Sequence, residues 1–394
     1  MIAPIMWKRK MKRRNFIKIM AAGSCITMVS PFSGAYQLMA SRRKLKDLDP
    51  KATDNLLRLI SYAMQAPNSH NVQPWTIQIK GENRFDLFVD QERLLPFTDP
   101  PARQIHISQG TFIEYLRIAA SAMGYKLEVD LFPLGEYSNQ VIEDKPVASV
   151  RLIQDESIQE DPFYPWLLER QSNKRIYEDK PIPAKHLMEM ESLVVPRGVT
   201  IRHTSQKELL IPLSDILGRA MAIEVTDLDR NKETVDIFRF SEEEALQYRD
   251  GFSLANNGVT GFKRFMAETF FLGTREEAYA VDSAFSKEGT KMTYEQAKSA
   301  VAYGWIESES NSRVDQFKVG ELYSRINLLT ARQGVSMHPM SQVLQEYEDM
   351  KGLQKEFLEL LNVKPGSTVQ MLFRMGYAEP VPHTKRLFVN EITS

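Results

Sequence analysis

The sequence predicts an α+β fold in which two related halves pack together as an internal pseudo-dimer. Amphipathic helical segments alternate with short runs of strand-forming residues in both parts of the chain. Gly110 and Gly124 bracket one amphipathic helix, and Gly320 and Gly334 bracket another at the same spacing. Short helices can match by chance, but a predicted strand follows each of these two. The repeat therefore indicates a duplicated unit.

The boundary between the halves is predicted at a link rich in proline and acidic residues, residues 155–165. We expect one half at 47–160 and the other at 165–394. The chain has 394 residues, which is enough for a duplicated domain. Residues 240–310 are expected to be a helical insertion rich in aromatic residues. They fit either a helical part of the core or a lid over a binding site.

The first half begins with a helix and a hairpin. Apolar residues recur at helical spacing over residues 54–65, just before a proline-containing loop. Residues 75–80 and 85–89 alternate between apolar and polar types around a Gly-Glu-Asn turn. This pattern predicts two antiparallel strands.

The rest of that half is predicted to be a long helix and a strand. Ser108 is a suitable N-cap for the helix, and Gly124 a suitable C-terminal stop. Residues 147–153 then predict a strand, and residues 368–377 predict one near the end of the second half. Strands are thus expected in both halves.

Composition excludes several classes of protein. The formal net charge is −1 and the basic residues are dispersed, so no nucleic-acid partner is expected. Cys25 is the single cysteine, which excludes disulfides and cysteine chemistry from the mature protein. The six histidines show no metal-ligand spacing, so we expect no metal site.

Residues 1–40 are predicted to be an export signal. A basic stretch is followed by a modestly apolar run at 17–32 and then by small residues. Within it, residues 12–18 (KRRNFIK) resemble a twin-arginine motif. We expect the twin-arginine translocase as partner and a periplasmic location; the alternative is a basic amphipathic tail. This route moves folded proteins, which suits a chain that takes up a cofactor first.

The stretch 66–75 (APNSHNVQPW) is the most informative loop. Two prolines stiffen it, and its short polar side chains present donors and acceptors from a nearly fixed backbone. Such a loop suits the edge of a planar heteroaromatic ring, although a helix C-cap and turn is the alternative. The candidate binding residues are Pro67, Asn68, Ser69, Asn71 and Gln73.

A cluster of cations opens the second half at residues 170–177 (RQSNKRIY). Arginine supplies a bidentate fork and lysine a point charge, so the cluster could clamp a phosphate. The alternative is a solvated basic helix face. The candidates are Arg170, Ser172 and Lys174.

Together these motifs resemble the FMN-dependent nitroreductase superfamily. The resemblance implies that Arg170, Ser172 and Lys174 bind the FMN phosphate, ribityl chain and pyrimidine edge, and that the loop 66–75 contacts the flavin. A cation near that edge would stabilise the negative charge of reduced flavin.

The resemblance extends to two segments of the second half. The segment 334–342 (GVSMHPMSQ) is implied to run along the N5 side of the ring, with a backbone N–H able to bond N5; taken alone, it fits a helix C-cap and loop. Its candidates are Pro339, Met340 and Ser341. Arg386 matches the terminal phosphate anchor of the family, and Lys385 matches less well.

The motifs are divided between the halves. The first half holds the polar loop without a cationic clamp, and the second holds the clamp, while its own loop at 194–199 lacks the Asn and Gln. We therefore expect one composite FMN site per chain, a non-functional duplicate site, and a monomer. This pattern, with residues 103–108 (RQIHIS), resembles the Acg-type branch of the superfamily. That resemblance implies a cover over the flavin that would restrict access of bulky nicotinamides.

The predicted function is an FMN-dependent oxidoreductase of nitroreductase type. Hydride would pass through flavin N5 from a donor such as NADPH or NADH to a small nitroaromatic or quinone-like acceptor. No side chain need act as acid or base, so no catalytic residue is assigned. The alternatives are a non-catalytic protein that stores or sequesters FMN, and a structural homologue that has lost its cofactor.

Overall fold

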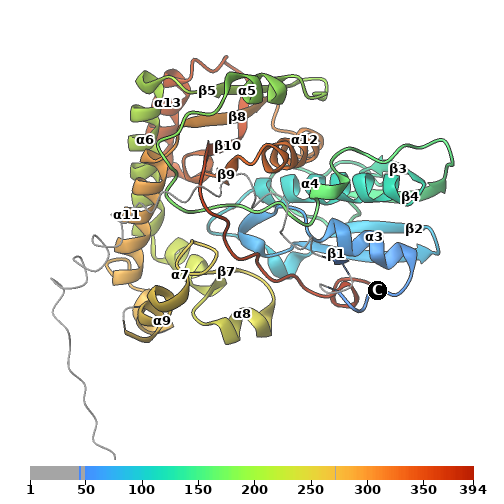
Figure 1. Ribbon diagram of the computed structural model, residues 1–394, viewed down its shortest axis with the longest axis horizontal. Helices are drawn as coiled ribbons and strands as arrows, with labels where there is room; N and C mark the ends of the chain where they lie inside the picture. The colour runs from blue at the N-terminus through green and yellow to red at the C-terminus, as the bar shows by residue number, and fades with distance from the viewer. Residues whose placement is uncertain (1–43, 46–48, 271) are drawn as a thin grey trace, which may run out of the picture. The chain divides into compact units, whose positions relative to one another are not determined.

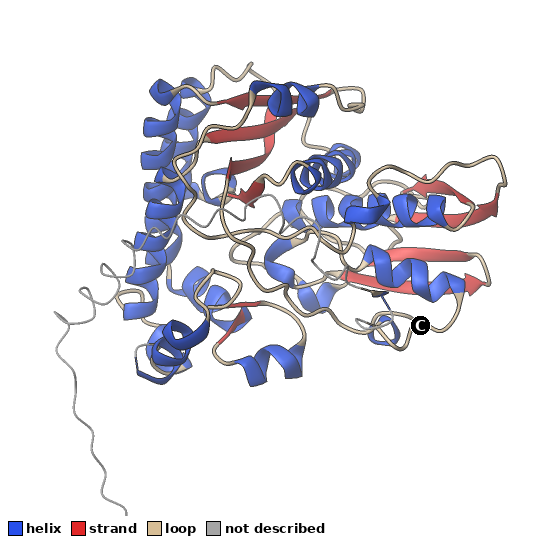
Figure 2. Ribbon diagram, in the orientation of Figure 1, coloured by secondary structure: helices blue, strands red, loops and turns tan. Residues whose placement is uncertain are grey.

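The computed structural model describes residues 44–45, 49–270 and 272–394. The predicted export signal lies outside the described residues. Figure 1 and Figure 2 show the helices and strands of the part from residue 49 onward, which combines helices with two four-stranded sheets. The predicted α+β class is therefore confirmed.

The first sheet and its helices are built from residues before the link. Asp54 caps the first helix by accepting a hydrogen bond from the Leu57 N–H at 2.9 Å. The hairpin and the strand predicted at 147–153 are confirmed. In order, the elements are α3 (Asn55–Ala63), β1 (Trp75–Gly81), β2 (Arg84–Val89), α4 (Arg103–Ala122), β3 (Tyr125–Leu131) and β4 (Ala148–Gln154).

The second sheet and its helices follow the link, and the strand predicted at 368–377 is confirmed. The main elements are α5 (Ala184–Glu191), β5 (Val199–Thr204), α6 (Lys207–Thr226), β8 (Ala302–Ser308), α12 (Arg313–Arg332), β9 (Ser336–Pro339), α13 (Lys351–Leu360) and β10 (Thr368–Gly376). Between α6 and β8 lie α7 (Leu228–Ile237), β6 (Phe238–Arg239), α8 (Glu242–Tyr248), β7 (Phe252–Ser253), α9 (Gly261–Phe270), α10 (Arg275–Ala278) and α11 (Ala284–Lys298).

The two sheets have the same topology. Their strand orders are β1-β2-β4-β3 and β5-β8-β10-β9, and every neighbouring pair is antiparallel. In each sheet a 20-residue helix, α4 or α12, stands between the second and third strands along the chain. This common order supports the idea of a duplication, while the pseudo-dimer and its boundaries stay a prediction.

Helices α4 and α12 cross at a pair of glycines and bring the two sheets' helices into direct contact (Figure 1). A Cβ atom on Gly110 would lie 1.9 Å from the Phe317 carbonyl oxygen, and one on Gly320 would lie 2.0 Å from the Ile107 carbonyl oxygen. Neither site has room for a side chain. The spaced glycines of the sequence are therefore required by the close approach of two backbones.

The start of α4 differs from the prediction. We expected Ser108 to cap this helix, but it begins at Arg103, so Ser108 lies inside it. The buried Asp99 carboxylate accepts hydrogen bonds from the N–H groups of Arg103 and Ile105, both at 3.1 Å. The cap therefore comes from a residue outside the helix, and sequence spacing does not reveal it.

Residues of the insertion form an aromatic cluster beside α7. The Phe238 ring lies edge-on to Phe240, Phe252 and Phe285, with centroids 5.1 to 5.4 Å apart. Helix α11 packs along α6 (Figure 1). None of the described helices has the length and apolar character that crossing a membrane requires.

Candidate functional site

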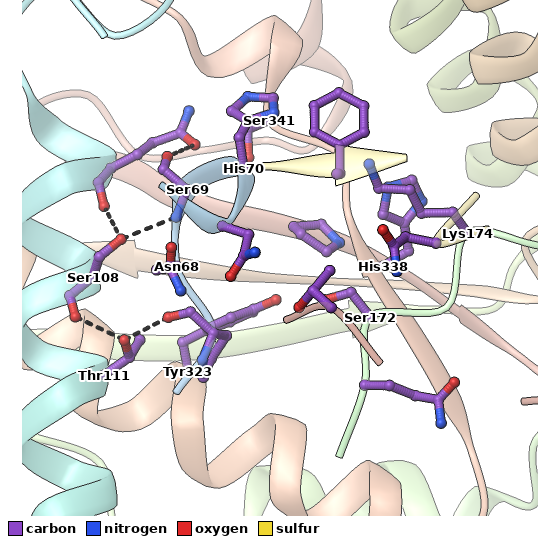
Figure 3. A pocket seen from close by; sticks show the side chains of 18 of the residues that line it. Asn68, Ser69, His70, Ser108, Thr111, Ser172, Lys174, Tyr323, His338 and Ser341 are labelled. Carbon is purple, nitrogen blue, oxygen red and sulfur yellow. Dashed lines mark hydrogen bonds between the residues drawn. The ribbon is translucent and has the colours of Figure 1, made fainter. Parts of the chain in front are cut away.

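A pocket in the described chain is lined by segments that are far apart in sequence (Figure 3). The loop after α3, the N-terminal half of α4, the segment after the link, the segment after β9 and the C-terminal segment all contribute. The residues used below that line it are Gln65, Pro67, Asn68, Ser69, His70, Asn71, Gln104, Ser108, Thr111, Arg170, Ser172, Lys174, Glu224, Phe252, Asn256, Tyr323, His338, Pro339, Ser341, Gln342, Gln345 and Arg386.

The loop after α3 has an unusual backbone. His70, Asn71 and Gln73 have φ values of 44°, 61° and 55°. These values lie in the left-handed region, which residues other than glycine rarely adopt. Such strain persists only where surrounding contacts hold it, and it concentrates at binding sites. Here the Asn68 side-chain oxygen accepts a hydrogen bond from the Gln73 N–H at 2.9 Å.

The same loop is tied to distant parts of the chain. The Asn71 amide nitrogen donates to the carbonyl oxygens of Gly251 at 2.9 Å and Lys385 at 3.0 Å. The Gln73 amide nitrogen donates to the Arg249 carbonyl at 3.0 Å. The loop is thus positioned by both the insertion and the C-terminal segment.

Helix α4 supplies the floor beneath this loop. The Ser69 N–H donates to the Ser108 hydroxyl at 3.2 Å, and the Ser69 hydroxyl donates to the Gln104 side chain at 3.2 Å. The Thr111 hydroxyl donates to the Pro67 carbonyl at 2.6 Å. Figure 3 shows these bonds on one side of the pocket. They hold the loop against a helix rather than leaving it to move alone.

Two arginines converge on the C-terminal end of α3. Arg170 donates to the Gln65 carbonyl at 3.2 Å and to the Asn327 side chain at 3.1 Å. Arg386 donates to the carbonyl oxygens of Ala66 at 3.1 Å and Gln65 at 3.4 Å. The unpaired carbonyls and partial negative charge of a helix C-terminus attract cations. This end of α3 therefore gathers two guanidinium groups that lie far apart in the sequence.

The clamp segment is pinned beside β9. Ser172 forms a parallel bridge with Met337, and the Asn173 N–H donates to the Met337 carbonyl at 3.0 Å. The Lys174 ammonium lies 4.3 Å from the centroid of the Phe252 ring. Burial and then the nearby Arg374 cation lower the pKa of Lys174 to about 8.

Two cations of the pocket, Arg170 and Lys174, have no carboxylate partner among the described residues. Among the described residues, neither Arg170 nor Lys174 lies within 4.0 Å of a carboxylate oxygen, the limit for an ion pair. A buried positive region of this kind is suited to an anionic ligand such as a phosphate.

His338 is a pocket residue that sequence reasoning missed. The Arg374 Nε–H donates to its Nδ1 at 3.0 Å, so the imidazole is neutral and carries its proton on Nε2. Burial, Arg374 and Lys174 hold the pKa of His338 well below its usual range. His338 therefore offers the pocket an N–H donor and no charge. Arg374 lies on β10, opposite His338 in the strand pairing, which only the folded sheet reveals.

Most predicted site residues come together. Ten of the twelve line the pocket: Pro67, Asn68, Ser69, Asn71, Arg170, Ser172, Lys174, Pro339, Ser341 and Arg386. Gln73 and Met340 do not line it, and both are buried. The Gln73 side-chain oxygen accepts a hydrogen bond from the Leu387 N–H at 2.9 Å. The Met340 N–H donates to the Leu372 carbonyl oxygen at 2.8 Å. The less certain Lys385 is exposed.

Several buried polar atoms around the pocket lack hydrogen-bond partners among the described residues. They include the Asn71 side-chain oxygen, the Gln104 side-chain nitrogen and the Tyr323 hydroxyl. Such atoms are costly when buried unless a ligand or water satisfies them. Together with the cations, they fit a ligand that carries both an anionic group and a hydrogen-bonding polar surface, which are the properties of FMN.

The fold is an α+β fold with two similar antiparallel sheets, and its pocket gathers cations and polar groups from both parts of the described chain. No protein-family model matches the chain. The sequence is 21% identical over 339 residues to putative NAD(P)H nitroreductase Rv3131 of Mycobacterium tuberculosis, covering 85% of this chain and 89% of that protein. It is also 33% identical over 81 residues to putative NAD(P)H nitroreductase acg of the same species, covering 21% and 24% of the two chains.

The chain is therefore similar to proteins named putative NAD(P)H nitroreductases, and its resemblance to the Acg type is confirmed. A solved structure among the matches is the FMN-dependent nitroreductase NfnB from Mycobacterium smegmatis in complex with NADPH. It is 16% identical, covers 58% of this chain and 95% of its own, and has a TM-score of 0.36. At that distance the likeness places no residue.

Proposed function

We propose that this chain is an FMN-binding oxidoreductase of nitroreductase type that reduces a small nitroaromatic or quinone-like acceptor. When bound, FMN would supply hydride transfer at its N5 atom. NADPH or NADH is the proposed donor, since the relatives carry NAD(P)H nitroreductase names. The mechanism needs no acid or base from the protein, so binding and orientation carry the catalysis.

One observation supports the composite site above the others. The loop of the first half and the clamp of the second half line the same pocket, and Asn71 and Arg170 both face it. Arg170 and Arg386 are proposed to hold the phosphate at the end of α3. Lys174 is proposed to lie near the flavin edge that becomes negative on reduction.

The test is whether the purified protein binds FMN through these residues. We expect flavin absorption in the protein as purified or after reconstitution. Arg170→Ala removes a charge-assisted contact, so FMN affinity should fall about 10- to 100-fold. The control is Arg202→Ala, because Arg202 is a cation on an exposed strand face. Equal FMN affinity in wild type and Arg170→Ala would contradict the proposal.

The insertion favours a second candidate function, flavin storage. Phe252 and Asn256 belong to the insertion and line the pocket, and Phe252 contacts the Lys174 ammonium. A wall there would limit the approach of a bulky nicotinamide. Anaerobic mixing of the FMN-loaded protein with NADPH or NADH separates the two functions. Bleaching of the flavin band supports the enzyme; an unbleached band with retained FMN supports storage or another donor.

We also propose export through the twin-arginine translocase to the periplasm. The supporting feature is the KRRNFIK motif at 12–18, followed by a broken apolar run. Replacing Arg13 and Arg14 by lysine should retain the protein in the cytoplasm. Unchanged fractionation into the periplasm would contradict this route.

A further inference from the structure

One part of the pocket lining, which we call the Glu224 recess, consists of Glu224, Gln342 and Gln345 and differs in polarity from the cations. Helix α6 packs against the short helix η5 (Gln342–Leu344). Glu224 comes from α6, Gln342 begins η5, and Gln345 follows η5; all three line the pocket. The cations of the lining, Arg170, Lys174 and Arg386, all come from other segments of the described chain. The recess is therefore lined by one carboxyl group and by amides.

Glu224 is the unusual member of this recess. Its side chain is 95% buried, with a relative exposure of 5%, yet it lines the pocket. Among the described residues it accepts no hydrogen bond and forms no ion pair. A buried carboxyl group without a partner is costly unless something else occupies its lone pairs.

The charged groups around Glu224 do not neutralise it. Arg230 on α7 pairs with Asp349 at 2.8 Å and stacks over the Tyr347 ring at 3.7 Å. Glu233, on the same helix, accepts hydrogen bonds from the N–H groups of Phe97 and Thr98. Burial raises the pKa of Glu224 to about 7, Arg230 opposes that rise and Glu233 adds to it.

Two amides of the pocket lining are also incompletely bonded, Gln342 in the recess and Gln104 on α4. The Gln342 side-chain oxygen is buried without a partner, and so is the Gln104 side-chain nitrogen at the edge of the loop. One is an acceptor and the other a donor. A ligand that satisfies both needs a hydrogen-bond donor and an acceptor, and the Glu224 carboxyl group disfavours a negative charge on that ligand.

We propose that this Glu224 recess is the acceptor-binding subsite, and that it takes neutral or cationic ring compounds and disfavours anionic ones. The name acceptor rests on the proposed function, whereas the charge preference rests on the lining alone. Two groups of residues in one pocket would thus select opposite charges: the guanidinium groups a phosphate, and the Glu224 recess an acceptor without an acid group. Electrostatic complementarity of this kind sets specificity.

The experiment compares three nitroaromatic probes of similar size and different charge: para-nitrobenzyl alcohol, para-nitrobenzoate and para-nitrobenzylamine. Their binding to the full chain is measured by calorimetry at pH 6 and pH 8, on either side of the Glu224 pKa of about 7. Above that pKa the carboxylate is ionised, so the amine should bind about fivefold more tightly at pH 8 than at pH 6. The benzoate should weaken over the same range.

Glu224→Gln should remove both trends while keeping the shape of the side chain. Glu208→Gln, an exposed glutamate of the same helix, is the matched control and should behave like wild type. Lys174, whose pKa is about 8, titrates in every variant, so the difference between the two glutamine variants isolates Glu224. Gln342→Met is a second probe and should weaken the alcohol.

The outcomes separate this proposal from the proposed function. If Glu224→Gln keeps the charge order and pH trend of wild type, or if none of the probes binds wild type, the recess proposal is overturned whatever the FMN content. If the protein binds no FMN while the charge order depends on Glu224, the proposed function fails and the subsite stands. Probe binding is measured with and without added FMN for this reason.

Discussion

Helices α4 and α12 occupy equivalent places in the two sheets but present different chemistry. Counted from the first residue of each helix, Ser108 and Thr111 on α4 correspond to Lys318 and Glu321 on α12. The α4 residues are small, uncharged and line the pocket. The α12 residues take part in ion pairs, as Glu321 does with Arg117 at 2.8 Å.

A cluster of charges continues this contrast. Glu114 is 3% exposed and pairs with Arg117 at 3.2 Å and with Arg325 at 2.6 Å. Arg325 also pairs with Asp161 at 2.9 Å. Paired charges satisfy one another and leave little demand for a ligand. One side of the helix pair therefore presents uncharged polar groups to the pocket, while the other side uses its charges to hold the fold together.

The largest expected effect comes from the feature that the two helices share. Gly320→Ala would place a Cβ atom 2.0 Å from the Ile107 carbonyl oxygen, so the helices must separate. We expect a loss of about 3 kcal/mol in the free energy of unfolding, measured by urea denaturation. Gly110→Ala should cost a similar amount, because its Cβ would meet the Phe317 carbonyl in the same way.

The control for these variants is Gly289→Ala. Gly289 lies within α11, and a Cβ atom there meets nothing within 4 Å. Alanine is the better helix former, so this change should stabilise by about 0.5 to 1 kcal/mol. If Gly320→Ala behaves like Gly289→Ala, the close helix crossing is refuted.

The next effect tests whether the charged side is structural. Arg325→Ala leaves Glu114 with Arg117 alone, so we expect a loss of about 2 kcal/mol, less than for a buried charge left with no partner. FMN affinity should not change, because Arg325 is outside the pocket lining. Chemical denaturation and FMN titration of one preparation measure both quantities.

Arg332→Ala provides the comparison on the same helix. Arg332 pairs with Glu189, and both side chains are partly exposed, so the change should stay within about 0.5 kcal/mol. A marked loss of FMN in Arg325→Ala, with stability retained, would reverse the assignment of the two sides.

The sequence predicted the segments that line the pocket better than their surroundings. The loop around Asn71 and the clamp around Arg170 are local patterns, and their chemistry is visible in a few consecutive residues. Ser108 was assigned to a helix cap because the true cap, Asp99, lies outside the helix and binds it only after folding. Its role beneath the Ser69 loop therefore could not be read from spacing.

Other site features depend on contacts across the fold. A glutamate such as Glu224 on an amphipathic helix is ordinarily a surface residue, and only the packing of α6 against η5 buries it beside a pocket. Motif spacing likewise cannot show that the Gln73 side-chain oxygen and the Met340 N–H already form hydrogen bonds with backbone groups. Local chemistry was predictable because it needs only neighbours in sequence, whereas burial needs the assembled core.

The smallest expected effect concerns Lys174, a cation that lines the pocket. Burial and Arg374 lower the pKa of Lys174 to about 8 in the ligand-free protein, so it loses its charge as the pH rises from 7 to 9. An anionic ligand binds the charged form more tightly, and binding in turn favours the proton. FMN affinity should therefore fall with rising pH, by at most about tenfold over this range.

Lys174→Met should bind FMN more weakly at pH 7 and lose most of this pH dependence. Lys180→Met is the matched control, because Lys180 is exposed and lies over the Tyr377 ring, outside the pocket lining. FMN titrations followed by flavin fluorescence measure both variants. The same pH trend in Lys174→Met and wild type would show that this lysine does not face the flavin. The proposed binding of FMN by cations of the pocket would then depend on Arg170 and Arg386 alone.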